Sequence, residues 1–206
     1  MRKNKGSFFG FFGMAVVMGF VLTVWGAALF AQTAADFDTK AAGNGVVITK
    51  YKGAGGNVVI PATIGGKAVV GIGEEAFPSN ESLASVTIPD GVTGIGRSAF
   101  GGCSGLTAIS VSSENRQYQD RDGVLFTKDG KTLHSYPAGK GGTAYTIPNG
   151  VTSIGASAFG GYTGLASVTI PASVTSIGDN AFYGCKSLKP EVHADIEKRF
   201  GKSVFQ

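Results

Sequence analysis

The chain has 206 residues, of which 43% are hydrophobic and 16% charged, and its formal net charge is +4. Arg2, Lys3 and Lys5 supply three of the 18 basic residues, whereas all 14 acidic residues lie beyond Ala31, so the chain after Ala31 carries only +1. This balance leaves no basic stripe for a phosphate backbone and excludes a nucleic-acid partner, while roughly 175 residues are enough for one domain with a continuous core.

The N-terminus is typical of an export signal. Residues 1–5 read MRKNK, and residues 7–31 contain no charge and end in small residues, which is the layout of a signal peptide over residues 1–31. Cleavage after Ala31 or Ala28 would release an exported chain to the cell surface, the medium or the periplasm. An apolar run of about 20 residues can also remain as an anchor, so we expect membrane contact only through this segment, if it is uncleaved. Residues 32–44 are expected to form a linker.

Residues 45–71 predict strands and a hairpin that close the N-terminal end of the fold. The segments GVVITKYKG and NVVIPATIGGKAVVGIG are rich in β-branched residues, as strands are, and the second turns at Gly65-Gly66. The interval from Ile60 to Ile72 is longer than its counterparts in the later copies, such as Ile88 to Ile95. This irregular piece is therefore expected to cap the regular repeats.

Residues 72–188 contain a repeat. The string Ile-Gly-x-x-Ala-Phe begins at Ile72, Ile95, Ile154 and Ile177. The first and last steps between these positions are equal, and a fixed period of about 23 residues predicts one small unit stacked on copies of itself. Each copy reads as a half-buried strand, a turn at Pro, a second extended piece and a short helical turn that carries Phe inward. No copy can cover its own apolar face, so stacking should bury the Leu, Val, Ile and Phe positions as ladders. The ladder of aromatic positions is Phe77, Phe100, Phe159 and Phe182.

The middle step, from Ile95 to Ile154, is more than twice as long as the others and identifies one atypical coil, at residues 112–146. Two strand-like stretches, Val124-Leu125-Phe126 and Leu133-His134-Ser135-Tyr136, flank Asp129-Gly130, which is a strong two-residue hairpin signal. We expect a long coil with a projecting hairpin, and we place His134 on the outer side of a hairpin strand.

The C-terminal residues 189–206 predict a helix. Val192, Ile196 and Phe200 recur at every fourth position, Pro190 stands at the start and Gly201 follows the end, as at the termini of helices. The segment can cap the last coil or present an amphipathic helix to a partner. Capping is the favoured interpretation, because the last coil must be covered.

Residue types that carry chemistry are few. Cys103 and Cys185 occupy the same repeat position about three coils apart, which places them roughly 14 Å from each other at a strand spacing of about 4.8 Å, beyond the reach of a disulfide. We predict two free, buried thiols. His134 and His193 lie at no metal-ligand spacing, and GIGEEA and GIGRSA match a dinucleotide fingerprint only because they are the turn of the repeat. No catalytic residue, cofactor or metal is predicted, and the chain is not expected to be an enzyme.

The repeat strings resemble the BspA-like branch of the leucine-rich repeats. The resemblance rests on VTIPDGVTGIGRSAFGGCSGL, YTIPNGVTSIGASAFGGYTGL and VTIPASVTSIGDNAFYGCKSL, and it extends from about Gly45 to the C-terminus. It implies a strand-rich α/β fold, a right-handed leucine-rich-repeat solenoid with a β-hairpin at the N-terminal end and a helix at the C-terminal end. Members of the family are exported proteins of host-associated microbes, and some are adhesins.

A solenoid offers a large continuous surface for binding. Small, nearly uncharged side chains are predicted to point outward from the strands, and Arg116 and Arg121, with Tyr118 as a further candidate, form a richer patch near the insertion. The strand face is equally well interpreted as plain solvated surface, because it lacks the Trp, Tyr and Arg that dominate binding energy. The expected function is recognition of a protein partner outside the cytosol, including adhesion to host or matrix proteins, and the alternative is a structural component of the cell envelope. The strand-face candidates are Ser85, Thr87, Ala108, Ser110, Ser167 and Thr169.

Overall fold

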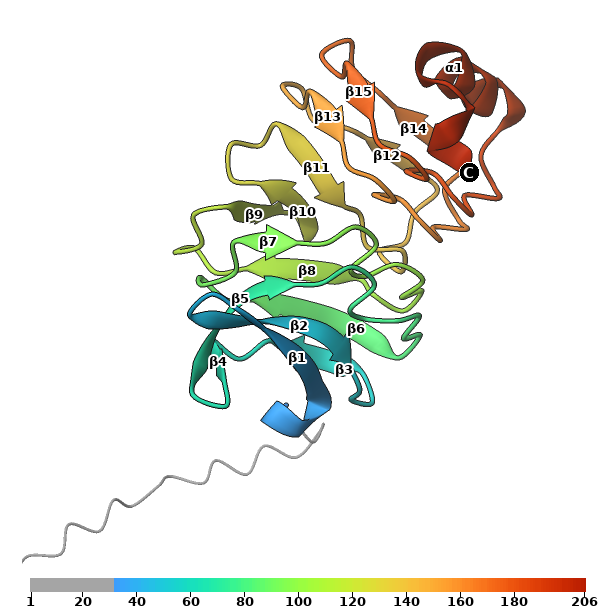
Figure 1. Cartoon of the computed structure of the whole chain (residues 1–206). Coiled ribbons are helices and arrows are strands. Elements are labelled where there is room, and N and C mark those ends of the chain that lie inside the picture. The colour runs from blue at the N-terminus through green and yellow to red at the C-terminus, as the bar shows by residue number, and fades with distance from the viewer. Residues whose placement is uncertain (1–31) are drawn as a thin grey trace, which may run out of the picture.

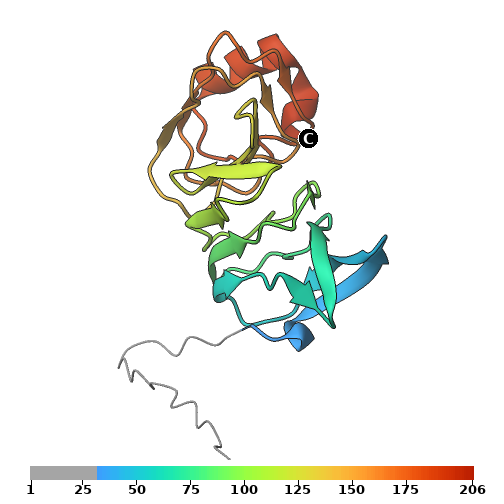
Figure 2. The same ribbon diagram turned by 90° about the vertical axis from the view of Figure 1, so that its left-hand side faces the viewer.

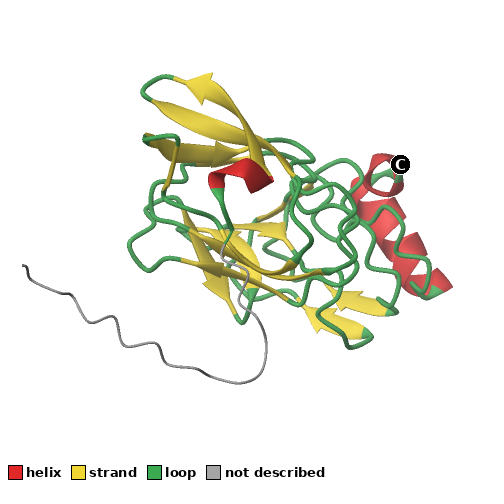
Figure 3. Ribbon diagram, turned by 90° about the horizontal axis from the view of Figure 1, so that it is seen from below, coloured by secondary structure: helices red, strands yellow, loops and turns green. Residues whose placement is uncertain are grey.

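The computed structural model describes residues 32–206, and the predicted signal peptide lies outside them. The chain winds as a solenoid, so that successive segments of the sequence lie one above another from the N-terminal end to the C-terminal end (Figure 1). Strands make up most of the regular structure, and the one α-helix of the described residues, α1 (Pro190–Phe200), lies at the C-terminal end (Figure 3). The predicted leucine-rich-repeat solenoid is confirmed.

The repeat period sets the register of the parallel strands. Ser85 pairs with Ala108, Gly71 with Gly94, and Ser153 with Ser176, and each partner stands one full period further along the chain. The strands that follow one another on one side of the coil are β3 (Gly56–Val59), β6 (Leu83–Ile88) and β8 (Ala108–Val111), then β12 (Ala144–Thr146) and β14 (Ser167–Thr169). Those on a second side are β5 (Lys67–Ile72) and β7 (Gly94–Ile95), then β11 (Thr132–Ser135), β13 (Ser153–Ile154) and β15 (Ser176–Ile177).

The inward Phe positions form aromatic ladders, as predicted. Phe77, Phe100, Phe159 and Phe182 are all buried, and ring centroids of consecutive coils lie 5.1 to 5.2 Å apart. Three of the four turns that carry a Phe have paired i to i+3 hydrogen bonds, such as Ala181 N–H to the Gly178 carbonyl and Tyr183 N–H to the Asn180 carbonyl, whereas Pro78, which follows Phe77, has no N–H to donate. These bonds are the form that the predicted short helical turn takes. Tyr51 and Tyr136 extend the two ladders, the first by stacking on Phe77 and the second by stacking on Phe159.

The buried residues fall into two clusters rather than one uninterrupted core. The first contains Phe77 and Phe100, and the second contains Phe159 and Phe182. We call the parts of the fold around them the first stack (residues 37–111) and the second stack (residues 124–206). They lie one above the other and meet at the atypical coil (Figure 2). We call this junction the seam.

The inserted hairpin is part of the seam and does not project. Its strands β9 (Tyr118–Arg121), β10 (Val124–Thr127) and β11 pair in antiparallel order. Leu125 is buried in the first cluster, whereas its neighbours Val124 and Phe126 are buried in the second. Because adjacent side chains of a strand point to opposite faces, β10 serves both stacks, and the expectation of a projecting hairpin is wrong.

The predicted linker over residues 32–44 is also corrected. Residues 34–36 form a short 3-10 turn, and β1 (Phe37–Ala42) pairs antiparallel with β2 (Gly45–Tyr51) along its whole length. The Phe37 ring packs at a tilt against that of Tyr51, with centroids 5.3 Å apart, and Phe37 is buried. The extra strand β1 supplies hydrogen-bond partners to the outer edge of β2. Its Phe37 also covers the Tyr51 ring, the first ring of the ladder. The hairpin predicted at Gly65-Gly66 is present, between β4 (Thr63–Ile64) and β5.

The C-terminal segment folds as the predicted helix. Ile196 of α1 and Val204 of the following 3-10 turn (Lys202–Phe205) are buried in the second cluster, against which Val192 and Phe200 also pack. The backbone carbonyl of Val204 accepts the N–H of Phe182 at 2.8 Å. In this way residues 203–204 take the place of a further coil at the end of the ladder.

Candidate binding surfaces

The strand-face candidates lie on both stacks. Ser85 and Thr87 of β6 stand beside Ala108 and Ser110 of β8, and on the second stack Ser167 and Thr169 belong to β14, beside β12. Ser110 and Thr169 are exposed and the others partly so. Val59, opposite Thr87 on β3, is 58% exposed, and adds an apolar side chain to the row.

The seam interrupts this strand face. No strand of residues 32–206 pairs directly with both β8 and β12. Instead the hairpin turn at Gly123 lies against β8: the Gly123 carbonyl accepts the Ile109 N–H at 2.9 Å, and a Cβ on Gly123 would lie 3.1 Å from that of Ala108. The structure therefore groups the first-stack candidates together and keeps them apart from Ser167 and Thr169.

The candidate patch near the insertion separates into residues with different environments. Arg116 and Arg121 are both exposed. Arg121, however, lies over the ring of Phe126, at 5.3 Å from its centroid, and against Gly130, where even a Cβ would collide with its guanidinium. Tyr118 is buried, and its hydroxyl accepts the Ile95 N–H at 3.0 Å. The three residues therefore do not form one exposed patch.

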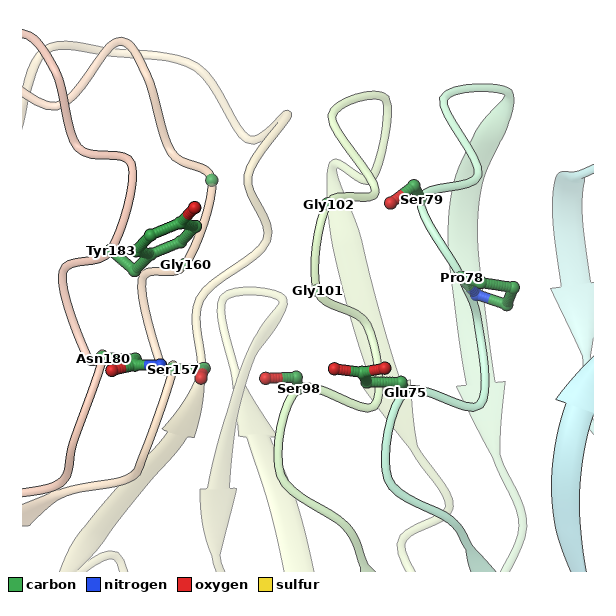
Figure 4. Close-up of a pocket in the computed structure, with 11 residues that line it drawn as sticks. Glu75, Pro78, Ser79, Ser98, Gly101, Gly102, Ser157, Gly160, Asn180 and Tyr183 are labelled. Atoms are coloured by element: carbon green, nitrogen blue, oxygen red, sulfur yellow. The ribbon is translucent and has the colours of Figure 1, made fainter. Parts of the chain in front are cut away.

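A hollow that sequence reasoning missed opens on the side of the Phe-bearing turns. It has a volume of about 370 Å³ and lies between turns of the first stack and turns of the second (Figure 4). Ser98 and Ser157 face it from opposite walls, Glu75 and Asn180 stand one coil further out, and Tyr183, 61% exposed, borders one end. The walls converge at two glycines: a Cβ on Gly161 would lie 3.6 Å from the Gly102 Cα. We call this hollow the notch.

The notch results from a coil that is two positions short. Phe100 stands at the fifth position after Ile95, and Phe159 at the fifth after Ile154, but Tyr136 is at the third after Leu133. Yet Leu133 pairs with Ile154, and Tyr136 N–H donates to the Ala158 carbonyl as the Phe of a regular coil would. The short coil therefore lacks the turn that would stand between Ser98 and Ser157. This deficit in spacing was the signal in the sequence that could have revealed the notch.

His134 lies in the seam, against Ile95 and Tyr118, and not on an outer strand face as expected. Its Nε2 lies 3.2 Å from the Ile95 carbonyl, and its ring meets that of Tyr118 edge to face at 5.7 Å between centroids. Its Nδ1 is buried and has no hydrogen-bond partner among residues 32–206. Since burial disfavours the charged form, the pKa of His134 is lowered from its ordinary value of 6.5.

This lowered pKa predicts acid sensitivity. The unfolded imidazole takes up a proton as the pH falls through 6.5, and the folded one resists it, so stability is complete above that pH and declines below it. Between pH 7.5 and 5.0, His134 should contribute a loss of up to about 2 kcal/mol in the free energy of unfolding, since each pH unit is worth about 1.4 kcal/mol. Urea unfolding of the native chain and of His134→Gln at both pH values measures this pH-dependent loss in the free energy of unfolding. Equal losses in the two proteins would contradict the prediction.

The two thiols are buried, as predicted, and neither forms a disulfide. Cys103 Sγ lies 3.2 Å from the Phe77 carbonyl, and Cys185 Sγ lies 3.3 Å from the Phe159 carbonyl, so each thiol bonds to the preceding coil. Burial raises the pKa of both, that of Cys185 to about 12. Because the thiolate is the nucleophile, neither thiol is suited to nucleophilic chemistry.

Alkylation should reflect this burial. In native protein at pH 8, iodoacetamide is expected to leave Cys103 and Cys185 unmodified over an hour. In denaturant without reductant both should react, which mass spectrometry detects as two added groups. Modification of the native protein, or fewer than two groups after unfolding, would show that the thiols are exposed or oxidised.

The described residues hold no group of three or more His, Cys, Asp or Glu side chains that could bind a metal ion. Within residues 32–206, no helix has the length and apolar character needed to cross a membrane.

Comparison with protein families gives a match to the BspA type leucine rich repeat region, in six copies, over residues 58–121 and 139–206. The unmatched interval between them, residues 122–138, contains β10 and β11. Comparison with curated proteins gives no match.

The solved structures that are similar to this chain include the following three. A leucine-rich repeat protein from Eubacterium ventriosum shares 29% identity over 65% of this chain and 41% of that one, with a TM-score of 0.52. The T. pallidum leucine rich repeat protein TpLRR shares 24% identity over 82% of this chain and 95% of its own length, with a TM-score of 0.48. A leucine rich cell surface protein from Faecalibacterium prausnitzii shares 25% identity over 79% of this chain and 54% of its own length, with a TM-score of 0.46. The chain spans about two fifths of the length of the Eubacterium protein.

Proposed function

Because the chain belongs to the BspA-type leucine-rich repeat family, whose repeats point to protein–protein interaction, we propose that it is an exported, non-enzymatic protein that recognises a protein partner outside the cytosol. The observation that carries the proposal is the ordered strand face of the first stack, formed by β3, β6 and β8 in one sheet. Export is supported by the basic and apolar pattern of residues 1–31.

The strand face suits a binding surface for a physical reason. Val58, Val86 and Ile109 are buried beneath it, in register on neighbouring strands, so the outward side chains stand on a fixed base. A surface that is ordered before binding loses little conformational freedom when a partner docks. Small side chains also let a partner approach the sheet closely.

Adhesion to a host surface or matrix protein is the specific form of this proposal, and a structural role in the cell envelope is the alternative from another class. Protease added to intact cells separates them. An adhesin faces outward and is digested, whereas an envelope component inside the outer boundary is spared.

Direct binding is measured with residues 32–206 immobilised and matrix proteins such as fibronectin, laminin and collagen in solution. We expect saturable binding to at least one, weakened at least tenfold by Thr87→Lys or Ser110→Lys, because a buried unpaired ammonium opposes docking. Thr39→Lys, on the exposed side of β1, is the matched control and should bind as the native chain does. Absence of saturable binding to all of them would count against adhesion.

A further inference from the structure

Adjacent coils are joined by two repeated backbone hydrogen bonds at the Phe-bearing turn. In the first, the residue two places before Phe donates to the next coil: Glu75 to Arg97, Ser157 to Asp179, and Asn180 to Ser203, at 2.8 to 3.2 Å. In the second, the Phe itself donates, as in Phe77 to Ala99 and Phe159 to Ala181, at 2.9 and 2.7 Å. These bonds run along the axis of the solenoid, from each coil to the one after it.

The coil before the notch has no such acceptors. Ser98 and Phe100 occupy the two donor positions, but within residues 32–206 neither N–H has a hydrogen-bond partner, because the short coil lacks the turn that would accept. On the opposite wall, Ala156 occupies the acceptor position of Arg97 and Asp179, and its carbonyl receives no donor from the described residues. The missing turn thus leaves main-chain donors on one wall and a main-chain acceptor on the other.

We propose that the notch binds a polypeptide turn of the partner protein, whose main chain replaces the turn that the short coil lacks. A carbonyl of the inserted turn accepts the Ser98 N–H, and an N–H of the same turn donates to the Ala156 carbonyl. The inference rests on the proposed function and adds to the strand face a second contact site with its own mode of recognition. A polypeptide backbone carries an N–H donor and a carbonyl acceptor in every residue except proline, which lacks the N–H. The regular coils of this solenoid are joined along the axis by bonds of the same kind.

The side chains around the notch agree with a loop as occupant. Its walls carry small or glycine positions, including Ser98, Ser157, Gly101 and Gly160, so a main chain can come close. Glu75 and Tyr183 stand at its ends, where a basic or amphipathic side chain of the loop can reach a carboxylate and a ring. The residues that line the walls form no deep apolar pit for a large hydrophobic anchor.

Amide hydrogen exchange tests whether the two donors are open. In native protein the Ser98 and Phe100 amides should exchange at least about 100-fold faster than those of Ser157 and Phe159, which occupy the same positions but bond to the next coil. Inserting Ala-Asn between His134 and Ser135 restores the regular spacing and should slow the Ser98 amide toward the rate of Ser157. Equal rates for Ser98 and Ser157 in the native chain would overturn the inference.

Binding is tested by NMR on ¹⁵N-labelled residues 32–206 with a head-to-tail cyclic peptide that displays Gly-Asp-Asn-Ala-Phe, the turn of residues 178–182. We expect saturable shifts of the Ser98, Phe100 and Ser157 amides. The double variant Ser98→Asn with Ser157→Asn should raise Kd at least tenfold, because larger side chains narrow the notch. Asn tolerates the positive φ of both positions, +52° and +56°. Ser113→Asn, an exposed serine outside the notch, is the control and should leave Kd unchanged.

Three outcomes would overturn the assignment. They are no saturable shift at millimolar peptide, an unchanged Kd in the double variant, and saturable binding at the notch of a neutral oligosaccharide, N-acetylglucosamine trimer, without binding of the peptide. The proposed function fails separately. If a matrix protein binds the native chain and the double variant equally, recognition stands and the notch is not its site. If the peptide binds but no protein partner does, the notch stands and the proposed function falls.

Discussion

Replacing Phe159 with alanine is expected to lower the free energy of unfolding by about 3 to 5 kcal/mol. Phe159 is fully buried, and its ring stacks on those of Tyr136 and Phe182 at 5.1 Å between centroids. Its removal takes away apolar contacts on two coils and leaves a cavity that the neighbouring turns cannot close, because their backbones are bonded to one another. Urea unfolding at pH 7.5, followed by circular dichroism, measures the loss.

Tyr183→Ala is the matched control for that experiment. Tyr183 follows Phe182 in the same kind of turn but is 61% exposed, so its truncation should change the free energy of unfolding by less than about 0.5 kcal/mol. A Phe159→Ala protein as stable as the native chain would mean that the aromatic ladder does not hold the second stack together.

Replacing Asn115 with alanine is expected to lower the free energy of unfolding by about 2 to 4 kcal/mol. This is the second largest effect expected, after that of Phe159→Ala. Asn115 is fully buried, and its side-chain amide bonds only to backbone groups. Nδ2 donates to the carbonyls of Pro89 and Val92 at 2.9 and 3.0 Å, and Oδ1 accepts the N–H groups of Gln117 and Tyr118 at 2.9 and 2.8 Å. Alanine would leave these backbone groups without their partners and free the start of β9 from the first stack.

Asn57→Ala provides the comparison, because the Asn57 side chain is exposed and accepts a hydrogen bond from the Ser85 hydroxyl. Replacing Asn57 with alanine should lower the free energy of unfolding by less than about 0.5 kcal/mol. The same urea experiment applies to both variants. If Asn115→Ala were as mild as Asn57→Ala, the buried amide would not be what fastens the hairpin to the coil below it.

The regular part of the fold could be predicted from spacing alone. A fixed period with Phe at one offset is enough to place Phe77 and Phe159 inside and to set the strand register, since a parallel stack repeats one set of contacts. The same reasoning buries Cys103 and Cys185, because both stand at one position of the repeat. The proposed strand face follows from the alternation of β6 and β14, although alternation alone does not say which outward surface binds.

The irregular parts could not be predicted in the same way. Residues 37–42 carry few apolar side chains, and their strand exists because β2 offers an unpaired edge, which is a property of the folded neighbour rather than of the segment. The environment of His134 likewise depends on the short coil, which displaces it from an outer face into the junction with Ile95. Local sequence patterns predict individual strands and turns. The strand at residues 37–42 and the place of His134 depend instead on the unpaired edge or the space that the neighbouring coil leaves.

The seam also determines how the molecule loses its structure. Within each stack a coil is joined to the next by paired strands and stacked rings. Across the seam single backbone bonds, such as Gly139 N–H to the Leu106 carbonyl, take the place of strand pairing. There β7 contacts β11 through the side chains of Tyr118 and His134, which bond to the backbone of Ile95. In a linear array, the weakest interface between neighbours sets the boundary of each cooperative unit. The protein should therefore melt as two such units, and a force applied between its ends should part them at the hairpin before either unravels.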